Sequence, residues 1–111
     1  MKGKIIQEKI FSIRGQQVIL DKDLAELYQI SLSQLHQQVQ RNIKRFPKNF
    51  MFQLTAQEWN ALKGGDQKLP FAFTEHGVAM LSSVLNSAPA IHMNRNIIRE
   101  LVSSEFFKGC P

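Results

Sequence analysis

The side chains best suited to chemistry in this chain are hydrogen-bond donors and cations that recur at helical spacing between positions 32 and 46. At about 100° per residue, the apolar residues of this segment fall in one narrow sector; they are Leu32, Leu35, Val39, Ile43 and Phe46. The opposite face carries Ser33, Gln34, Gln37, Gln40, Arg41 and Lys44, with Gln38 and Arg45 on one flank and His36 at the other boundary. No Asp or Glu occurs between Glu26 and Glu58. Amides and guanidinium groups can pair with base edges and lysine neutralises phosphate, so this face suits the major groove of DNA.

The expected roles of these side chains differ along the helix. When a helix lies in the major groove, its N-terminal part meets the bases and its C-terminal part approaches the backbone. We therefore expect base contacts from the first part and phosphate contacts from the end of the segment. The predicted DNA-binding residues are Ser33, Gln34, Gln37 and Arg41 for bases, Lys44, Arg45 and Lys48 for phosphates, and Gln38 on the flank of the same face. A solvated face on a basic protein would also be polar, and one helix taken alone leaves that alternative open.

The segment before this helix favours a helix-turn-helix. Asp21 is a suitable N-cap for a helix over residues 22–28. Gln29-Ile30-Ser31 has the length of the turn in such motifs, with Ser31 capping the second helix. Gln29 stands where glycine would avoid the cost of a positive φ.

Strand patterns lie on both sides of the helix pair. The β-branched run over 5–13, a turn over 14–17 and a return strand over 18–20 predict an N-terminal β-hairpin. After Pro47, residues 50–54 alternate as a half-buried strand, and 69–73 are expected to pair back with it.

Capping signals mark three further helices. Thr55 and Glu58 predict a capping box for a short helix that Gly64-Gly65 ends. Thr74 is the expected cap of a helix over 75–85, and Ser87 of a last helix beginning near Pro89. The predicted fold class is therefore α+β: an N-terminal β-hairpin, a helix-turn-helix, a second short sheet segment and two C-terminal helices.

Global properties fit one compact domain with a core over about residues 5–102. The chain has 111 residues, 43% of them hydrophobic, and a net charge of +5, which favours a nucleic acid as partner. The sequence shows no apolar stretch near the roughly 20 residues needed to span a bilayer, and no signal-peptide core. We expect the cytoplasm of a bacterial or phage-infected cell, and no membrane partner.

No residue pattern supports catalysis. His36, His76 and His92 lack metal-ligand spacing, and Cys110 is the only cysteine. Gly64-Gly65 is followed by Asp66, unlike a phosphate-binding loop. Glu75-His76-Gly77 fits the first turn of a helix better than an acid–base pair. We expect no enzyme activity, cofactor, metal or small-molecule substrate.

Two secondary sites and an interface complete the predictions. Lys63 and Lys68 flank the Gly64-Gly65 loop, which either touches phosphate as a small wing or is a solvated loop. Arg95 and Arg99 lie one turn apart on the last helix and either extend the phosphate contacts or are ordinary surface charges. The same helix carries a broad apolar sector, which predicts a homodimer through this helix; its members are Ile91, Ile97, Ile98, Leu101 and Val102.

Three stretches carry a family resemblance: IRGQQVILDKDLAELY, LHQQVQRNIKRFPKNFMFQLTAQEW and FAFTEHGVAMLSSVLNSAPAIHMNRNIIREL. They resemble the KilA-N-related N-terminal domain of phage and prophage regulatory proteins, the group often called the ORF-six N-terminal domain. The similarity covers about Ile5 to Leu101, and departs from the family at Gln29, where glycine is usual, and at His76, where glutamine is common. The resemblance implies DNA binding, in a family whose members are frequently fused to antirepressor-type domains.

The leading hypothesis is therefore a phage- or prophage-type transcriptional regulator that binds specific double-stranded DNA through its helix-turn-helix. The alternative is an antirepressor-like protein-interaction module whose basic face binds an acidic partner protein. An RNA-directed or nuclease-type enzyme is poorly supported, because no carboxylate cluster for metals accompanies the basic face.

Overall fold

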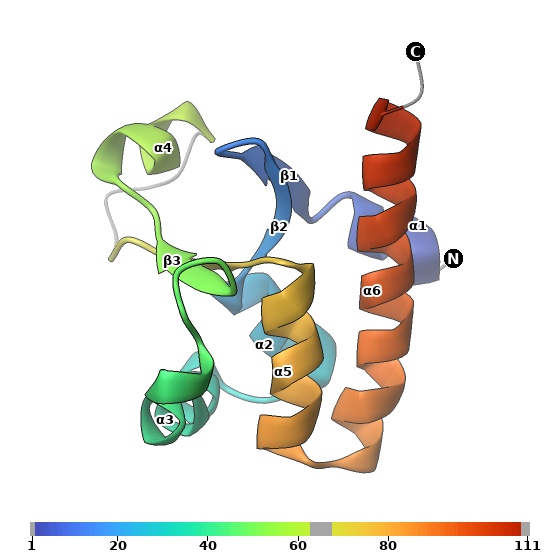
Figure 1. Cartoon of the computed structure of the whole chain (residues 1–111). Coiled ribbons are helices and arrows are strands. Elements are labelled where there is room, and N and C mark those ends of the chain that lie inside the picture. Colours follow the sequence, from blue (N-terminus) through green and yellow to red (C-terminus); the bar gives the residue numbers. More distant parts are fainter. Residues whose placement is uncertain (1, 63–67, 110–111) are drawn as a thin grey trace.

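The computed structural model describes the backbone of residues 2–62 and 68–109 and the side chains of residues 5–62 and 68–102. Within this part of the chain six α-helices accompany a four-stranded antiparallel sheet, which confirms the predicted α+β class (Figure 1). The elements are α1 (Lys2–Gln7), β1 (Ile10–Ile13), β2 (Gln16–Leu20), α2 (Asp21–Tyr28), α3 (Leu32–Arg41), the 3-10 turn η1 (Ile43–Arg45), β3 (Met51–Gln53), α4 (Ala56–Ala61), β4 (Phe71–Phe73), α5 (Glu75–Leu85) and α6 (Ala88–Gly109).

The N-terminal hairpin is shorter at its start than predicted. Ile5 and Ile6 belong to α1, which packs against α6, and Ile6 is fully buried there. The prediction of one strand over the β-branched run 5–13 was therefore wrong at its start, because burial against a distant helix outweighs local strand propensity. A hydrogen bond of 2.8 Å from Gln7 Nε2 to Glu100 Oε1 also joins the two helices.

The hairpin turn is also tighter than predicted. Ile13 pairs with Gln16, so only Arg14 and Gly15 form the loop, and the predicted turn over 14–17 was wrong at its last two residues. Both loop residues have positive φ, 55° and 76°, as a two-residue type I′ turn requires.

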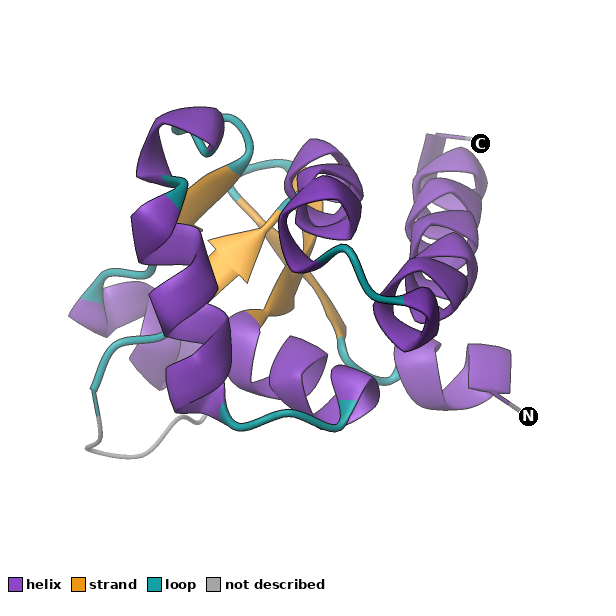
Figure 2. Cartoon of the chain, turned by 90° about the horizontal axis from the view of Figure 1, so that it is seen from below, coloured by secondary structure: helices purple, strands orange, loops and turns teal. Residues whose placement is uncertain are grey.

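The sheet order is β1-β2-β4-β3, so segments far apart in sequence meet at its centre. Met51 pairs with Phe73 and Gln53 with Phe71, which confirms the predicted pairing of the two segments. Phe52 and Leu54 are buried and Gln53 is exposed, as the predicted alternation requires, but Met51 is only 8% exposed, so the prediction of a half-buried strand was wrong at that residue. The helices α2, α3, α5 and α6 cover one face of the sheet and α4 lies over the other (Figure 2). Trp59 of α4 belongs to the hydrophobic cluster on that second face.

The predicted caps of α4, α5 and α6 are confirmed. In α4, Thr55 and Glu58 form the capping box, and Thr74 Oγ1 accepts the Gly77 N–H at the start of α5. Ser87 Oγ accepts the Ala90 N–H at 3.3 Å in the first turn of α6. The predicted stop at Gly64-Gly65 lies outside the described residues.

A buried amide holds α2, α5 and α6 together. Asn94 of α6 is fully buried, and its side-chain oxygen accepts the hydroxyl hydrogen bond of Tyr28 from α2. Its Nδ2 donates to the Val78 carbonyl at 3.1 Å and to Ser82 Oγ at 2.8 Å, both in α5. Burial raises the pKa of Tyr28, which keeps its hydroxyl a donor. The helix that precedes α3 is thereby fixed to the C-terminal pair.

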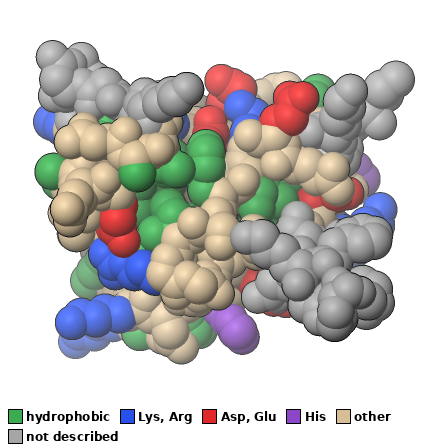
Figure 3. Space-filling view, turned by 90° about the horizontal axis from the view of Figure 1, so that it is seen from above, with side chains coloured by type: hydrophobic (Ala, Val, Ile, Leu, Met, Phe, Trp, Pro, Cys, Tyr) green, Lys and Arg blue, Asp and Glu red, His purple; other side chains and the backbone are tan. Residues whose placement is uncertain are grey.

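The end of the molecule formed by α4 and the hairpin carries charges of both signs around hydrophobic side chains (Figure 3). Arg14 in the hairpin turn makes two hydrogen bonds to the Glu58 carboxylate, of 2.8 and 3.0 Å. This pair connects the hairpin turn to α4.

Candidate nucleic-acid interface

The turn between α2 and α3 has the geometry predicted for Gln29. This residue is left-handed, with φ 62° and ψ 41°. Its N–H donates to the Glu26 carbonyl at 3.1 Å, and the Ile30 N–H donates to the Ala25 carbonyl at 3.0 Å. These two bonds define a Schellman motif, which satisfies the last carbonyls of α2 and sets the direction of α3.

Asp21 has a different role from the predicted N-cap. The helix α2 begins at Asp21 itself, and Leu20 occupies the cap position without a side-chain bond. The carboxylate is 1% exposed, accepts the Lys22 N–H at 2.7 Å, and lies 2.6 Å from Nε2 of His36 in α3. Asp21 therefore links the first turn of α2 to the middle of α3, a contact that sequence reasoning missed because no local pattern pairs residues 15 apart.

Ser31 caps α3 as predicted, and the cap also engages Gln34. Ser31 Oγ accepts the Gln34 N–H at 3.0 Å, while Gln34 Oε1 accepts the Ser31 N–H at 3.0 Å. The reciprocal bonds form a capping box. Gln34 is exposed, but its side-chain oxygen is occupied by the cap.

The helix ends earlier than its apolar stripe predicted. Asn42 has non-helical angles, and its Nδ2 donates to the Gln38 carbonyl at 2.9 Å, a local bond that competes with continued helix. The chain then forms η1 ahead of Pro47. Leu32 and Ile43 are 38% and 43% exposed, so the stripe was wrong at these two positions, while Leu35, Val39 and Phe46 are buried.

The exposed ridge of α3 consists of Ser33, Gln37 and Arg41, which are four residues apart and all exposed. On one side of this ridge, a hollow of about 200 Å³ lies between His36, Gln40 and the strands β3 and β4. On the other side, a hollow of the same size separates Gln34 and Gln38 from the turn between α5 and α6. The ridge therefore projects between two shallow depressions.

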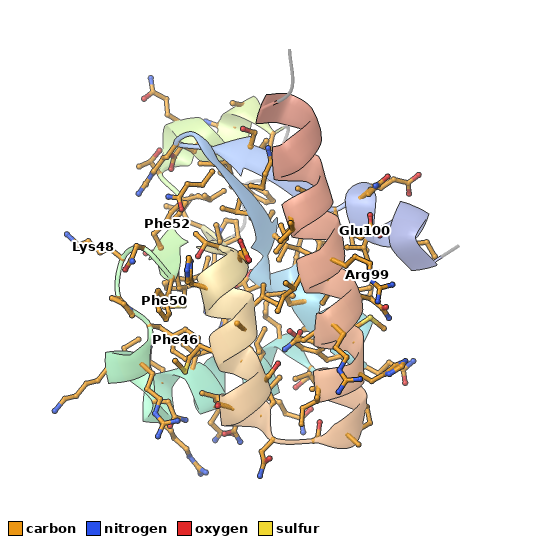
Figure 4. All side chains as sticks on the ribbon, turned by 45° about the vertical axis from the view of Figure 1, so that its right-hand side comes forward. Phe46, Lys48, Phe50, Phe52, Arg99 and Glu100 are labelled. Atoms are coloured by element: carbon orange, nitrogen blue, oxygen red, sulfur yellow. The ribbon has the colours of Figure 1, made fainter. Side chains whose placement is uncertain are left out.

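Cations follow the ridge without carboxylate partners. Arg41, Lys44, Arg45 and Lys48 are all exposed. The ion pairs among the described side chains involve Lys9, Arg14 and His36, and none of these four. In Figure 4, Lys48 points away from the molecule. This set of four cations, here called the basic end of α3, is free to meet an anion.

The loop that carries Lys48 is held against the start of α5. Thr74 donates through its N–H to the Phe50 carbonyl at 3.0 Å and through Oγ1 to the Asn49 carbonyl at 2.8 Å. A Cβ on Gly77 would lie 2.1 Å from the same Phe50 oxygen, so only glycine permits this approach. The Phe50 ring stacks on His76 with 5.5 Å between centroids.

The predicted secondary residues are not all on the same side as α3. Lys68 is exposed and lines a hollow that also contains Leu32 and His36 of α3. Arg95 and Arg99 are exposed on the face of α6 opposite its buried residues, and Figure 4 places Arg99 and Lys48 on opposite sides of the molecule. Lys63 lies outside the described residues.

Comparison with known proteins matches the chain to a family model. The family model described as the ORF6N domain covers residues 8–84, from the end of α1 almost to the end of α5. No curated protein and no solved structure matches the chain. Among the described residues, none of the helices has the length and apolar character required to cross a bilayer.

Proposed function

The chain belongs to the ORF6N domain family, a phage-associated family, and on this premise we propose that it is a phage-type regulator that binds specific double-stranded DNA through α3. In this proposal the domain is a KilA-N-related DNA-binding domain, and α2, the Gln29–Ser31 turn and α3 act as its helix-turn-helix.

The observation that carries the proposal is the acid-free ridge of α3. Ser33, Gln37 and Arg41 present a hydroxyl, an amide and a guanidinium group in one line. Such groups can hydrogen-bond base edges in the major groove, which is wide enough to admit one helix. Gln37 lies at the centre of the ridge, so it is the residue we expect to contribute most to sequence discrimination.

The basic end of α3 supplies the electrostatic part of binding. Arg41, Lys44, Arg45 and Lys48 follow one another where α3 gives way to η1 and the Pro47 loop. Cations at this position would contact the sugar-phosphate strand beside the groove and fix the register of the helix. Because Gln34 Oε1 is held by the Ser31 cap, Gln34 can offer only its amide hydrogens to a base.

Selection of bound fragments from a random duplex library tests the proposal. We expect the selection to enrich one sequence motif. Binding of the protein to that motif should weaken as the salt concentration is raised. Binding of every duplex with equal affinity would remove sequence specificity from the proposal. No duplex binding at low salt would remove DNA as the partner.

A second candidate function is an antirepressor-like module that binds an acidic protein. Two apolar residues favour it: Leu32 and Ile43 are 38% and 43% exposed at the two ends of the polar face. Exposed apolar groups beside cations are more typical of a protein interface than of a phosphate contact. The fragment selection separates the two candidates, since this module would enrich no DNA motif.

A homodimer through α6 is part of the proposal. Ile91 and Val102 are 37% and 44% exposed on one side of α6, with the partly buried Ile98 between them. Helix-turn-helix proteins commonly dimerise to read two half-sites about one DNA turn apart. Light scattering at tens of micromolar protein is expected to give twice the chain mass, and one chain mass with and without DNA would refute the dimer.

A further inference from the structure

We infer that Lys22 and Lys68 form a second phosphate-contact site, at the N-terminal end of α3 and opposite its basic end. The inference rests on the proposed DNA binding and adds a second strand contact to it. Lys22 is the second residue of α2, and Lys68 precedes β4, so neither belongs to the helix they would serve.

The two lysines share one surface hollow with α3. The hollow has a volume of about 360 Å³, and its other walls are apolar or aromatic for the most part. Leu32, the first residue of α3, and His36, one turn later, line the same hollow. Lys22 Nζ lies 5.1 Å from the centroid of the Trp59 ring, which holds the ammonium group at the rim. Both lysines are exposed.

The three carboxylates of α2, the helix that carries Lys22, are already engaged. Asp21 also lines the hollow, but it is 1% exposed and its carboxylate is bound to His36 and to the Lys22 N–H. Asp23 and Glu26 both contact Lys9 Nζ, at 3.5 and 2.9 Å. Among the described side chains, neither Lys22 nor Lys68 has an ion-pair partner. The pair is therefore available to an external anion.

The length of α3 fits a contact with two strands. Ten residues span about 15 Å at about 1.5 Å per residue, and the major groove is about 12 Å wide. A helix that crosses this groove places its two ends near the two bordering phosphate strands. The basic end of α3 would meet one strand, and Lys22 with Lys68 would meet the other.

Salt titrations of duplex binding test this inference with single and double variants. Lys22→Gln and Lys68→Gln keep polar side chains of moderate length while removing the charge. Binding is measured by fluorescence anisotropy with a labelled duplex. The plot of log K against log salt has a negative slope, and each single variant should make this slope less steep by about 0.9. The double variant should make it less steep by about twice that amount. The loss of affinity should be equal on the selected motif and on random duplex, because phosphate contacts carry no sequence information.

Arg99→Gln is the matched control, since it removes one exposed cation on the side of the molecule away from Lys48. The slope should change more for Lys22→Gln and Lys68→Gln than for Arg99→Gln, which measures the effect of losing one charge elsewhere on the surface. Equal changes in all three variants would refute a specific site at Lys22 and Lys68. If the double variant, folded as judged by its melting temperature, keeps the parent slope and affinity, the second site does not exist while the proposed function stands. If the parent chain itself binds no duplex, both the proposed function and this inference fall.

Discussion

Asp21 and His36 join the first turn of α2 to the middle of α3, with 2.6 Å between Oδ2 and Nε2. The carboxylate is buried and the imidazole is partly exposed, with 43% of its side chain accessible. The Asn94 amide fixes α2 to α5 and α6. The contact between Asp21 and His36 therefore holds the exposed ridge of α3 in a defined position relative to the core.

Asp21→Ala is expected to lower the free energy of unfolding by roughly 1.5–3 kcal/mol, since it removes hydrogen bonds to a charged group. Urea unfolding measures this loss as a lower midpoint. Asp21→Asn, which keeps the shape and one acceptor, should lose less. Equal midpoints for Asp21→Ala and the parent protein would show that the contact does not hold α3.

Gln37→Ala tests the ridge of α3 as the reader of sequence. It should cost roughly 1–3 kcal/mol of binding on the selected motif and little on random duplex, because a base contact and no phosphate contact is lost. Competition binding with the two duplexes measures the ratio. Gln37 is exposed and contributes nothing to the core, so the melting temperature should barely change.

Lys44→Ala is the matched comparison for Gln37→Ala. It should weaken binding to both duplexes about equally. It should also make the fall of log K with log salt concentration less steep by about one unit. If both variants bind the two duplexes as the parent does while remaining folded, α3 is not the DNA reader, and the protein-interaction candidate replaces it.

Gly77→Ala is expected to destabilise the protein by about 1–3 kcal/mol, although alanine is the better helix former. The new Cβ would lie 2.1 Å from the Phe50 carbonyl oxygen, so α5 and the Pro47 loop must separate. Thermal unfolding measures the loss. The control is Ala79→Gly on the exposed side of the same helix, where about 1 kcal/mol is expected from backbone freedom alone. A gain in stability for Gly77→Ala would contradict the close contact.

Acid should weaken the link between the hairpin turn and α4. The hydrogen bonds from Arg14, aided by the Thr55 N–H, lower the pKa of Glu58 from its ordinary 4.5 to about 2. A carboxyl whose pKa is lower in the folded state stabilises that state above the unfolded pKa, and the effect is lost as pH falls from about 4.5 toward 2. Glu58→Gln keeps a capping side chain but removes the charge, so its melting temperature should fall less steeply over this window. Parallel curves for the two proteins would refute this assignment.

The parts of the fold that could be predicted are those encoded within a few residues. Thr55 with Glu58, Thr74 and Ser31 place helix starts correctly, because a capping side chain reaches a backbone N–H only two or three positions away. The positive φ at Gln29 was also predictable, since the spacing of two amphipathic segments left room for only a tight turn.

The parts that could not be predicted depend on distant partners. The segment around Ile6 is helical because it packs on α6, far along the chain. The helical spacing of apolar residues continues to Phe46 and therefore predicted a longer α3. The helix ends earlier because the Asn42 amide bonds to the Gln38 carbonyl. In the candidate site, the exposed side chains Ser33, Gln37 and Arg41 follow from helical period, whereas the occupation of Gln34 by its cap and of His36 by Asp21 required three-dimensional contacts.

The Tyr28–Asn94 bond crosses the border of the region that the family shares, since Tyr28 lies inside residues 8–84 and Asn94 lies beyond them. Ile97 and Leu101, which fill the core beside Asn94, also lie beyond that border. In this chain the shared region therefore shares its core with α6. An engineered chimaera that replaced the sequence after position 84 would leave the buried Tyr28 hydroxyl of α2 without its Asn94 partner, whereas a splice point after Leu101 would keep Asn94, Ile97 and Leu101, the last buried residue of α6 among the described side chains.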